Sequence, residues 1–340
     1  MSQTRREFLR TALLTGAAAN LTDAAETSGR TAADGAMPRR VLGRTKESVT
    51  ILGLGCAYAG GGVSETQTRA AIEAALEGGV RYFDAAPEYT QAEERLGPVV
   101  KPVRDKVFLV SKSYAHDAKT AEKDLATALK QLQTDHVDLF LQHGVGLKPV
   151  STNRQILGEG GSLSFLRKAK REGLTRFIGM SVHWPHTAAL ELLRASGEWD
   201  VVMPYVNYVA RAQEEATDDV DFEDVNRPAR EALLPVARRH NLGIVAMKVL
   251  GGHPGKLAKD YDRAFRYALS VPGVACALIG VRSPDQVKRA VRAAKGFRPL
   301  TDVEMKETLR IGEEMARANT SEAIILSRHR EWDFGSPRHA

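Results

Sequence analysis

Three observations predict that this chain of 340 residues folds as an α/β barrel, in which eight parallel strands close into a ring that helices cover. Short runs of apolar, strand-forming residues recur along it, and continuous apolar runs are typical of parallel strands buried on both faces. Segments with helical spacing separate these runs. About 300 residues follow the polar N-terminal region, which suits one such barrel. The expected strands are 51–54, 82–84, 107–110, 137–141, 177–180, 201–203, 243–247 and 275–279.

A β-hairpin is expected ahead of the first strand, from Arg40 through a turn at Gly43-Arg44 to Thr50. The first helix has signals at both ends. Ser64 and Gln67 have the spacing of a capping box, in which each side chain satisfies a free backbone N–H of the other. Gly78-Gly79 is a typical helix stop. The segment between these signals is therefore predicted to be helical.

Later helices have similar signals. Leu125, Leu129 and Leu132 are spaced by four and three residues, which places them on one helical face. Pro185 and Ser283-Pro284 mark the starts of two further helices, because proline is tolerated in the first turn. Strand and helix repeated eight times predict a closed parallel barrel.

An open, doubly wound sheet is the competing fold. It is disfavoured because no G-x-G-x-x-G pattern of a dinucleotide-binding turn follows the first strand, and Gly53-x-Gly55 alone does not qualify. The barrel is expected over residues 37–298, and residues 299–340 are expected to form a C-terminal helical extension and a polar tail.

Composition excludes several classes of protein. The chain is 43% hydrophobic and 26% charged, with a net charge of +6. Its charges are mixed, so no basic tail for nucleic acid is expected. No apolar run reaches the ~18 residues of a membrane span. Two cysteines, Cys56 and Cys276, are too few for a disulfide framework, and they are expected at opposite ends of neighbouring strands, too far apart to pair. The histidines lack metal-site spacing, so no metal is expected.

The N-terminus is interpreted as a targeting segment. Arg5-Arg6 is followed by Phe8-Leu9 and by a short, alanine-rich apolar stretch over 11–19. Paired arginines ahead of such a stretch are typical of a twin-arginine export signal. Residues 1–36 are thus expected to be a signal and a disordered linker, the export machinery to be a partner, and the mature protein to be periplasmic or otherwise exported. The alternative is a basic terminus with no targeting role.

Polar residues end three of the expected strands. Asp84, Lys112 and His143 close the second, third and fourth runs, and Tyr89 follows in the loop after the second. Catalytic groups of a parallel barrel lie where strands end and loops begin. A buried lysine needs a counter-charge, which Asp84 on the neighbouring strand can supply. We therefore expect these four groups to lie close together.

These four groups suit proton-coupled hydride transfer to a carbonyl. Tyr89 would protonate the carbonyl oxygen, and the Lys112 ammonium is expected to lower the pKa of its phenol. Asp84 would hold Lys112 charged, and His143 would orient and polarise the carbonyl. A cofactor must supply the hydride, because no side chain can.

These residues lie in motifs that resemble those of the aldo-keto reductases, and the resemblance covers residues 37–298. It implies a (β/α)8 barrel, a catalytic tetrad of Asp84, Tyr89, Lys112 and His143, and NADPH, or less often NADH, bound without a Rossmann fold. The substrate would be an aldehyde, a ketone, or an alcohol or sugar hydroxyl. The matching segments are Val80–Tyr89, Ser111-Lys112, Asp138–His143 and Gly173–Ser181.

The resemblance also implies a set of cofactor-binding residues, although several positions depart from the family pattern. Ser181 matches the serine that meets the nicotinamide carboxamide, whereas Tyr205 stands where glutamine is common and Met247 replaces a stacking tyrosine. Arg282 is expected to bind a 2′-phosphate through its guanidinium, which favours NADP over NAD. Ser283 and Gln286 also fit an ordinary helix cap. The full expected set is Ser181, Tyr205, Asn207, Met247, Lys248, Leu250, Gly280, Arg282, Ser283 and Gln286.

Two other functions remain open from the sequence. One is a lyase in which Lys112 forms a Schiff base, which requires a neutral amine and is disfavoured by an adjacent Asp84. The other is a non-catalytic barrel that binds nucleotide, for which Tyr89 would be unnecessary. His183 and Trp184 are expected to line the pocket, and segments 144–161 and 211–227 to cover it.

Overall fold

The structure is a computed structural model that describes residues 35–146, 152–183, 186–209, 229–251 and 256–318. The described residues from Ala36 to Ala318 belong to one compact unit. The expected export signal and the polar tail beyond residue 318 lie outside the described residues, as do Trp184 and the segment 211–227. The export signal therefore stays a prediction.

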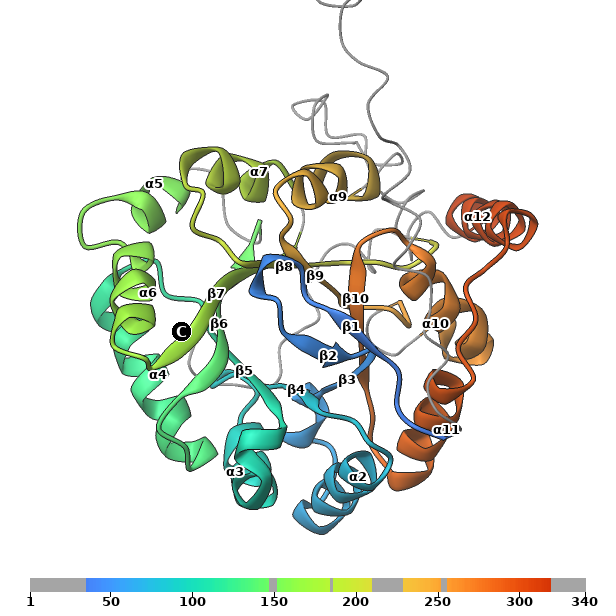
Figure 1. Ribbon diagram of the computed structural model, residues 1–340, viewed down its shortest axis with the longest axis horizontal. Coiled ribbons are helices and arrows are strands. Elements are labelled where there is room, and N and C mark those ends of the chain that lie inside the picture. The colour runs from blue at the N-terminus through green and yellow to red at the C-terminus, as the bar shows by residue number, and fades with distance from the viewer. Residues whose placement is uncertain (1–34, 147–151, 184–185, 210–228, 252–255, 319–340) are drawn as a thin grey trace, which may run out of the picture. The chain divides into compact units, whose positions relative to one another are not determined.

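Eight parallel strands form a closed barrel, as predicted. Each strand pairs with its neighbours in chain order, and the last strand, β10, pairs with the first, β3. Figure 1 shows the strands around a common centre, with helices outside them. The strands are β3 (Leu52–Gly55), β4 (Tyr82–Asp84), β5 (Phe108–Ser113), β6 (Val137–Val145), β7 (Thr175–Val182), β8 (Val201–Pro204), β9 (Gly243–Ala246) and β10 (Val274–Gly280).

The predicted hairpin precedes the barrel. Strands β1 (Arg39–Val41) and β2 (Ser48–Thr50) pair antiparallel through the 3-10 turn η1 (Gly43–Thr45), and they lie across the ring of strands in Figure 1. Gly43 has a φ of +49°, and a Cβ there would come within 2.3 Å of the Leu242 backbone. A glycine is therefore required where the hairpin meets the start of β9.

Helices follow the strands around the outside of the barrel. The first, α2, begins after Ser64, and both hydrogen bonds of the predicted capping box form between Ser64 and Gln67. The helices are α2 (Glu65–Glu77), α3 (Ala92–Val100), α4 (Ala118–Leu132), α5 (Thr152–Leu157), α6 (Ser162–Arg171), α7 (His186–Ala195), α9 (Ala229–Arg239), α10 (Tyr261–Ser270), α11 (Pro284–Lys295) and α12 (Asp302–Ala318), with 3-10 turns η2 (Cys56–Ala59), η3 (Lys101–Lys106) and η4 (Lys256–Asp260).

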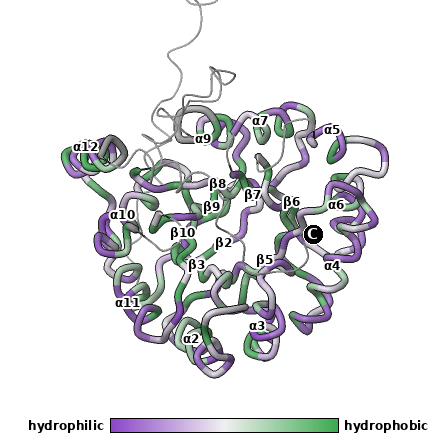
Figure 2. Tube along the Cα trace, turned by 180° about the vertical axis from the view of Figure 1, so that it is seen from behind, coloured by the Kyte–Doolittle hydropathy of each residue, from purple (hydrophilic) through white to green (hydrophobic). Residues whose placement is uncertain are grey.

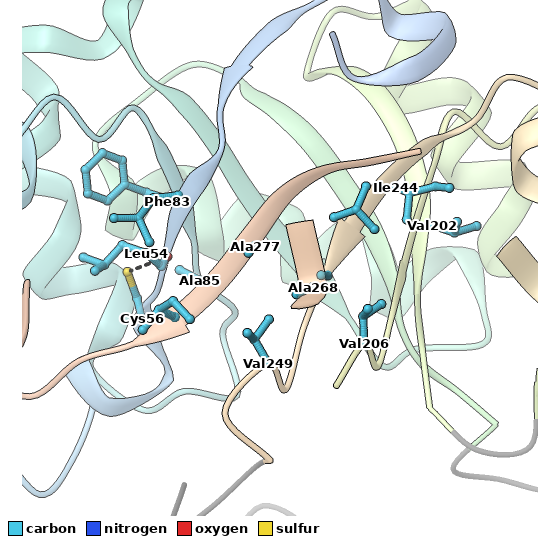
Figure 3. Close-up of a cluster of buried hydrophobic side chains, with 14 of the residues drawn as sticks. Leu54, Cys56, Phe83, Ala85, Val202, Val206, Ile244, Val249, Ala268 and Ala277 are labelled. Atoms are coloured by element: carbon cyan, nitrogen blue, oxygen red, sulfur yellow. Dashed lines mark hydrogen bonds between the residues drawn. The ribbon is translucent and has the colours of Figure 1, made fainter. Parts of the chain in front are cut away.

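The strands separate two hydrophobic clusters, because successive side chains point to opposite faces of a sheet. The inner cluster fills the barrel and includes Tyr82 and Phe108, whose rings stack 5.1 Å apart. The outer cluster lies between strands and helices, and Figure 3 shows part of it, including Leu54 and Phe83. Hydrophobic residues accordingly concentrate on the strands in Figure 2. Burial on both faces explains the continuous apolar runs.

The C-terminal helix α12 is held by ion pairing. The Arg266 guanidinium on α10 donates to both carboxylate oxygens of Glu304, each at 2.8 Å, and to the carbonyl of Pro299 at 3.1 Å. Among the described helices, none combines the length and the apolar character that crossing a bilayer requires. Cys56 lies in η2, just past β3 rather than at its end, and both it and Cys276 are buried free thiols.

Candidate active site

The carboxyl ends of all eight strands lie at one rim of the barrel, because the strands are parallel. Asp84 is the last residue of β4, and Lys112 is the next-to-last residue of β5. His143 lies in β6, next to a shift in the pairing between β6 and β7. The strands thus bring the three predicted side chains to the same rim.

Asp84 and Lys112 form a buried ion pair. The Lys112 Nζ donates to Asp84 Oδ1 at 2.5 Å and to the Ala85 carbonyl at 2.8 Å. Only 1% of Lys112 and 4% of Asp84 is exposed. Each charge alone would cost several kcal/mol to bury, so each stabilises the other. The predicted counter-charge is confirmed by this contact.

Tyr89 lies against this pair in the loop after β4. The Lys112 Nζ is 4.9 Å from the centre of the Tyr89 ring, within the range of a cation–π contact. The loop is held close to the segment after β3, since a Cβ at Gly60 would come within 1.5 Å of the Tyr89 carbonyl oxygen. Only glycine permits this approach, which sets the position of Tyr89 over Lys112.

The prediction that Lys112 lowers the pKa of Tyr89 is wrong. Burial of the phenol raises its pKa well above 10, and the nearby acidic groups Asp84 and Glu88 raise it further. The main physical reason is burial, which disfavours the charged phenolate. Lys112 is paired with Asp84 at 2.5 Å, and its stabilisation of the phenolate is smaller than the cost of burying that charge. The phenol therefore keeps its proton at neutral pH and serves as a hydrogen-bond and proton donor.

His143 completes the group. Its ring lies 5.9 Å from that of Tyr89, nearly perpendicular to it, and stacks on Tyr114 at 3.8 Å. Its Nδ1 faces Glu88 Oε2 at 3.4 Å. Burial lowers the pKa of His143, and the contact with Glu88 opposes that shift. Glu88 and Tyr114 were not expected from the sequence; the signal that could have pointed to them is their closeness to Tyr89 and Lys112 in the chain.

Behind the ion pair lies a second buried carboxyl group, that of Glu93 in the first turn of α3. Glu93 Oε1 accepts a hydrogen bond from the Ser111 hydroxyl at 2.6 Å, and the Glu93 side chain is fully buried. Burial is the main cause that raises the pKa of Glu93 to about 7. Glu93 is thus partly protonated near neutral pH, and its environment favours the neutral form.

We expect Glu93→Gln to remove a pH dependence from the free energy of unfolding. Because the folded pKa of about 7 lies above the ordinary 4.5, Glu93 stabilises the fold fully below pH 4.5, and this contribution is lost as the pH rises through 7. The loss amounts to about 3 kcal/mol. Urea unfolding at acidic and at alkaline pH measures it. The control is Glu94→Gln, an exposed neighbour on the same helix; equal pH dependence in both variants would contradict the prediction.

The residues expected to hold nicotinamide lie at the ends of β7, β8 and β9. The Ser181 hydroxyl accepts a hydrogen bond from the Gly144 N–H at 3.0 Å. The Tyr205 hydroxyl contacts His183 Nδ1 at 2.7 Å, and Tyr205 pairs in register with the buried Met247. His183 is thus linked to Tyr205, and its expected place in the pocket lining stays a prediction.

Two further expected cofactor residues follow these strands. Asn207 donates from its amide to the Lys248 carbonyl at 3.1 Å, which fixes the loop after β8 against the loop after β9. Lys248 has a left-handed backbone with a φ of 54°. Burial lowers the pKa of its amine well below the ordinary value, and the charge of Lys112 lowers it further. Leu250 packs against the outer core.

The residues expected to bind phosphate surround the start of α11. Ser283 caps this helix by accepting a hydrogen bond from the Gln286 N–H at 3.4 Å, and the Gln286 side chain accepts from the Arg282 N–H at 2.7 Å. Ser283 and Gln286 thus form the ordinary helix cap that the sequence analysis gave as their alternative role. Arg282 is exposed, and its guanidinium lies 4.5 Å over the Tyr58 ring. Gly280 makes room for Tyr58, since a Cβ there would come within 2.6 Å of that ring.

The described residues hold no cluster of three or more side chains suited to a metal ion. The Schiff-base alternative needs a neutral amine, whereas Lys112 is paired with Asp84. A closed parallel barrel with polar groups gathered at the carboxyl ends of its strands defines an enzyme of the (β/α)8 class.

The sequence model of the Aldo/keto reductase family matches residues 51–265. The chain therefore belongs to this family, and it is an oxidoreductase. L-Galactose dehydrogenase of Arabidopsis thaliana is 25% identical over 297 residues, covering 75% of this chain and 87% of that relative. Methylglyoxal reductase DkgA of Yersinia pestis is 34% identical over 146 residues, covering 41% of this chain and 47% of that relative. The match to DkgA thus spans about half of its length.

Solved structures share the fold. The aldo-keto reductase AKR11C1 of Bacillus halodurans, in its holo form, superposes with a TM-score of 0.64 at 24% identity, covering 81% of this chain and 96% of that one. An aldo-keto reductase from Klebsiella pneumoniae in complex with NADPH gives a TM-score of 0.62 at 21% identity, covering 82% of this chain and 96% of that one. At these identities the two structures support the barrel alone.

Proposed function

We propose that this protein transfers a hydride between NAD(P) and a carbonyl or alcohol, with Tyr89 as the general acid or base at the substrate oxygen. The observation that carries the proposal is the buried Asp84–Lys112 pair, with the Lys112 ammonium over the Tyr89 ring and His143 beside that ring. This arrangement places a neutral phenol and an imidazole at the barrel rim. Both can bind one substrate oxygen.

The residues present fit a nicotinamide dinucleotide. An exposed guanidinium, Arg282, precedes the N-terminus of α11, where backbone N–H groups and the helix dipole favour an anion. Ser181, Tyr205 and Met247 would hold the nicotinamide end, and Lys248, Gly280 and Arg282 the phosphates, with the remaining predicted residues shaping the loops. Bound nicotinamide would supply or accept the hydride. NADPH in the Klebsiella pneumoniae structure is consistent with this choice.

The chain's own residues handle the proton and the orientation of the substrate. In the reducing direction Tyr89 would donate its proton to the carbonyl oxygen. Lys112 is next to the ring and stabilises the phenolate that remains, while Asp84 keeps Lys112 in place. In the oxidising direction the phenolate takes the alcohol proton back.

The experiment that tests the function is a turnover assay that follows the absorbance of reduced nicotinamide. The relatives named above suggest methylglyoxal with NADPH or NADH, and L-galactose with NADP or NAD, as the first substrates. We expect turnover with at least one aldehyde, ketone or sugar of a broader panel. No turnover with any substrate and either cofactor would favour the non-catalytic barrel.

A preference for NADP is expected to depend on Arg282. In Arg282→Ala the KM for NADPH should rise about tenfold, because a charge-assisted hydrogen bond to the 2′-phosphate is lost. The KM for NADH should change little, since NADH has no such phosphate. The matched control is Arg292→Ala, an exposed arginine further along α11. An equal effect on both cofactors would contradict the assignment.

We also propose export by the twin-arginine route, on the strength of Arg5-Arg6 and the apolar stretch that follows. A fusion of residues 1–36 to a reporter active only outside the cytoplasm tests this. The reporter should be active with the natural sequence and inactive when Arg5 and Arg6 are both replaced by lysine. Activity in the lysine variant would contradict twin-arginine export.

A further inference from the structure

The closure of the barrel brings an aromatic ring against Arg282. Gly55 at the end of β3 pairs in register with Gly280 at the end of β10, so the segments that follow these two strands begin side by side. Tyr58 belongs to η2 after β3, and the Arg282 guanidinium lies 4.5 Å over its ring. A Cβ at Gly280 would come within 2.6 Å of that ring. The ring therefore occupies space that a glycine at position 280 leaves for it.

The contact with Tyr58 orders the Arg282 side chain. An exposed arginine has many rotamers, and fixing one of them when a ligand binds costs conformational entropy. The Arg282 backbone N–H donates to the Gln286 side chain at 2.7 Å, and the guanidinium rests on the ring of Tyr58. Tyr58 is half-buried, so its ring has fewer positions than an exposed one. Arg282 is thus held at its backbone and at its guanidinium before any ligand arrives.

Stacking on an aromatic ring is compatible with binding a phosphate. A guanidinium is planar, and its N–H groups point outward within that plane. The face of the plane can contact a ring while the N–H groups donate to phosphate oxygens, because the two contacts use different directions. The ring of Tyr58 can therefore hold the orientation of Arg282 without taking the place of an anion.

We propose that Tyr58 is a positioning residue that holds the Arg282 guanidinium near the start of α11 and thereby strengthens the preference for a 2′-phosphorylated dinucleotide. The inference rests on the proposed function, in which Arg282 binds the 2′-phosphate. Arg282 supplies the charge, and Tyr58 supplies its orientation at a helix N-terminus that favours an anion. Of two nucleotides that differ only in the 2′-phosphate, the phosphorylated one should depend on Tyr58.

A second stacked arginine on α11 provides an internal comparison. The Arg289 guanidinium lies 4.8 Å over the Tyr261 ring, and both Arg282 and Arg289 are exposed. Arg289 lies in the second turn of α11, past the N–H groups of the first turn, whereas Arg282 precedes the helix. The two arginines thus share the stacking and differ in their position relative to the helix start. Arg289 is accordingly expected to take no part in phosphate binding.

Binding of two small nucleotides tests the inference without turnover. Adenosine 2′,5′-bisphosphate and adenosine 5′-monophosphate differ only in the 2′-phosphate, and isothermal titration calorimetry gives the Kd of each. In Tyr58→Leu the Kd of the bisphosphate should rise about two- to fivefold, the contribution of a cation–π contact at an exposed site. The Kd of the monophosphate should stay the same. Tyr58→Phe keeps the ring and should bind both nucleotides as the natural protein does.

A double-mutant cycle separates positioning from a purely structural role. Arg282→Ala should raise the Kd of the bisphosphate about tenfold, and adding Tyr58→Leu should bring no further rise, because the ring then has no guanidinium to hold. Arg289→Ala removes the same charge and should leave both Kd values unchanged. Additive effects of Tyr58→Leu and Arg282→Ala would overturn the inference. Equal changes for the two nucleotides, or tighter binding of the bisphosphate to Tyr58→Leu, would also overturn it.

The same measurements distinguish failure of this inference from failure of the proposed function. If Arg282→Ala weakens binding of the bisphosphate and Tyr58→Leu does not, the inference is wrong and the proposed phosphate site stands. If Arg282→Ala has no effect, the phosphate site is wrong and the inference falls with it. Binding that depends on Tyr58, without turnover of any substrate, would support the inference and reject the proposed hydride transfer.

Discussion

Tyr89→Phe is expected to lower kcat by about a hundredfold to ten-thousandfold, the usual contribution of a general acid. The substitution removes only the hydroxyl, and the ring can still pack beside Lys112 and His143. The variant should therefore fold and bind cofactor. Turnover is measured from the absorbance of reduced nicotinamide, and binding from quenching of protein fluorescence. An unchanged kcat would show that another group provides the proton.

Tyr114→Phe provides the matched control. Tyr114 also lies against His143, but it is not placed over Lys112, so loss of its hydroxyl should change kcat far less. The pH profile gives an independent check. Because burial raises the pKa of Tyr89 well above 10, the free enzyme should show no loss of kcat/KM from Tyr89 deprotonation below pH 10. A loss near neutral pH that disappears in Tyr89→Phe would contradict the raised pKa.

The barrel could be predicted from the sequence because its strands are buried on both faces and read as apolar runs. The use of apolar runs to locate strands also explains why the strand ends were predicted less well. Strand β6 was expected over 137–141 and extends over Val137–Val145, since Gln142 and His143 are polar but still buried at the rim. Strand β5 likewise includes Lys112 beyond its expected end. Because the polar residues of a site interrupt the apolar run, the sequence pattern places the end of the strand too early.

The site residues that lie near the ends of strands could be predicted from the sequence. Asp84, Lys112 and His143 come together because they lie near the ends of neighbouring parallel strands. Glu88 and Tyr114 depend on loop paths that no periodicity encodes. Glu93 has the pattern of an ordinary acidic first turn of a helix, and its burial against Ser111 appears only in the packed structure.

The pKa of Tyr89 shows a second limit of prediction from the sequence, which concerns the direction of a pKa shift. From the sequence, the Lys112 ammonium was expected to lie close to Tyr89, so a lowered pKa was predicted. The structure adds the burial of the ring and the acidic groups near it, which act in the opposite direction. The sign of a shift depends on the sum of these effects, and the sum needs positions in space.

The largest effect on stability is expected from breaking the Asp84–Lys112 pair. Lys112→Met should lower the free energy of unfolding by about 3–5 kcal/mol, because it leaves the Asp84 carboxylate buried without its partner. The double variant Asp84→Asn/Lys112→Met removes both charges and should recover most of that loss. Chemical unfolding of the natural protein, both single variants and the double variant measures the coupling. Additive losses would show that the two charges do not depend on each other.

The exposed pair Arg69–Glu73 provides the control, with an N–O distance of 2.9 Å and side chains 61% and 46% exposed. Its removal should cost less than about 0.5 kcal/mol, because water screens both charges. The double variant at Asp84 and Lys112 also separates stability from chemistry. It should fold, yet turn over far more slowly, because the phenolate of Tyr89 would lose the ammonium beside its ring. A stable and inactive double variant would mean that the buried pair serves the reaction rather than the fold.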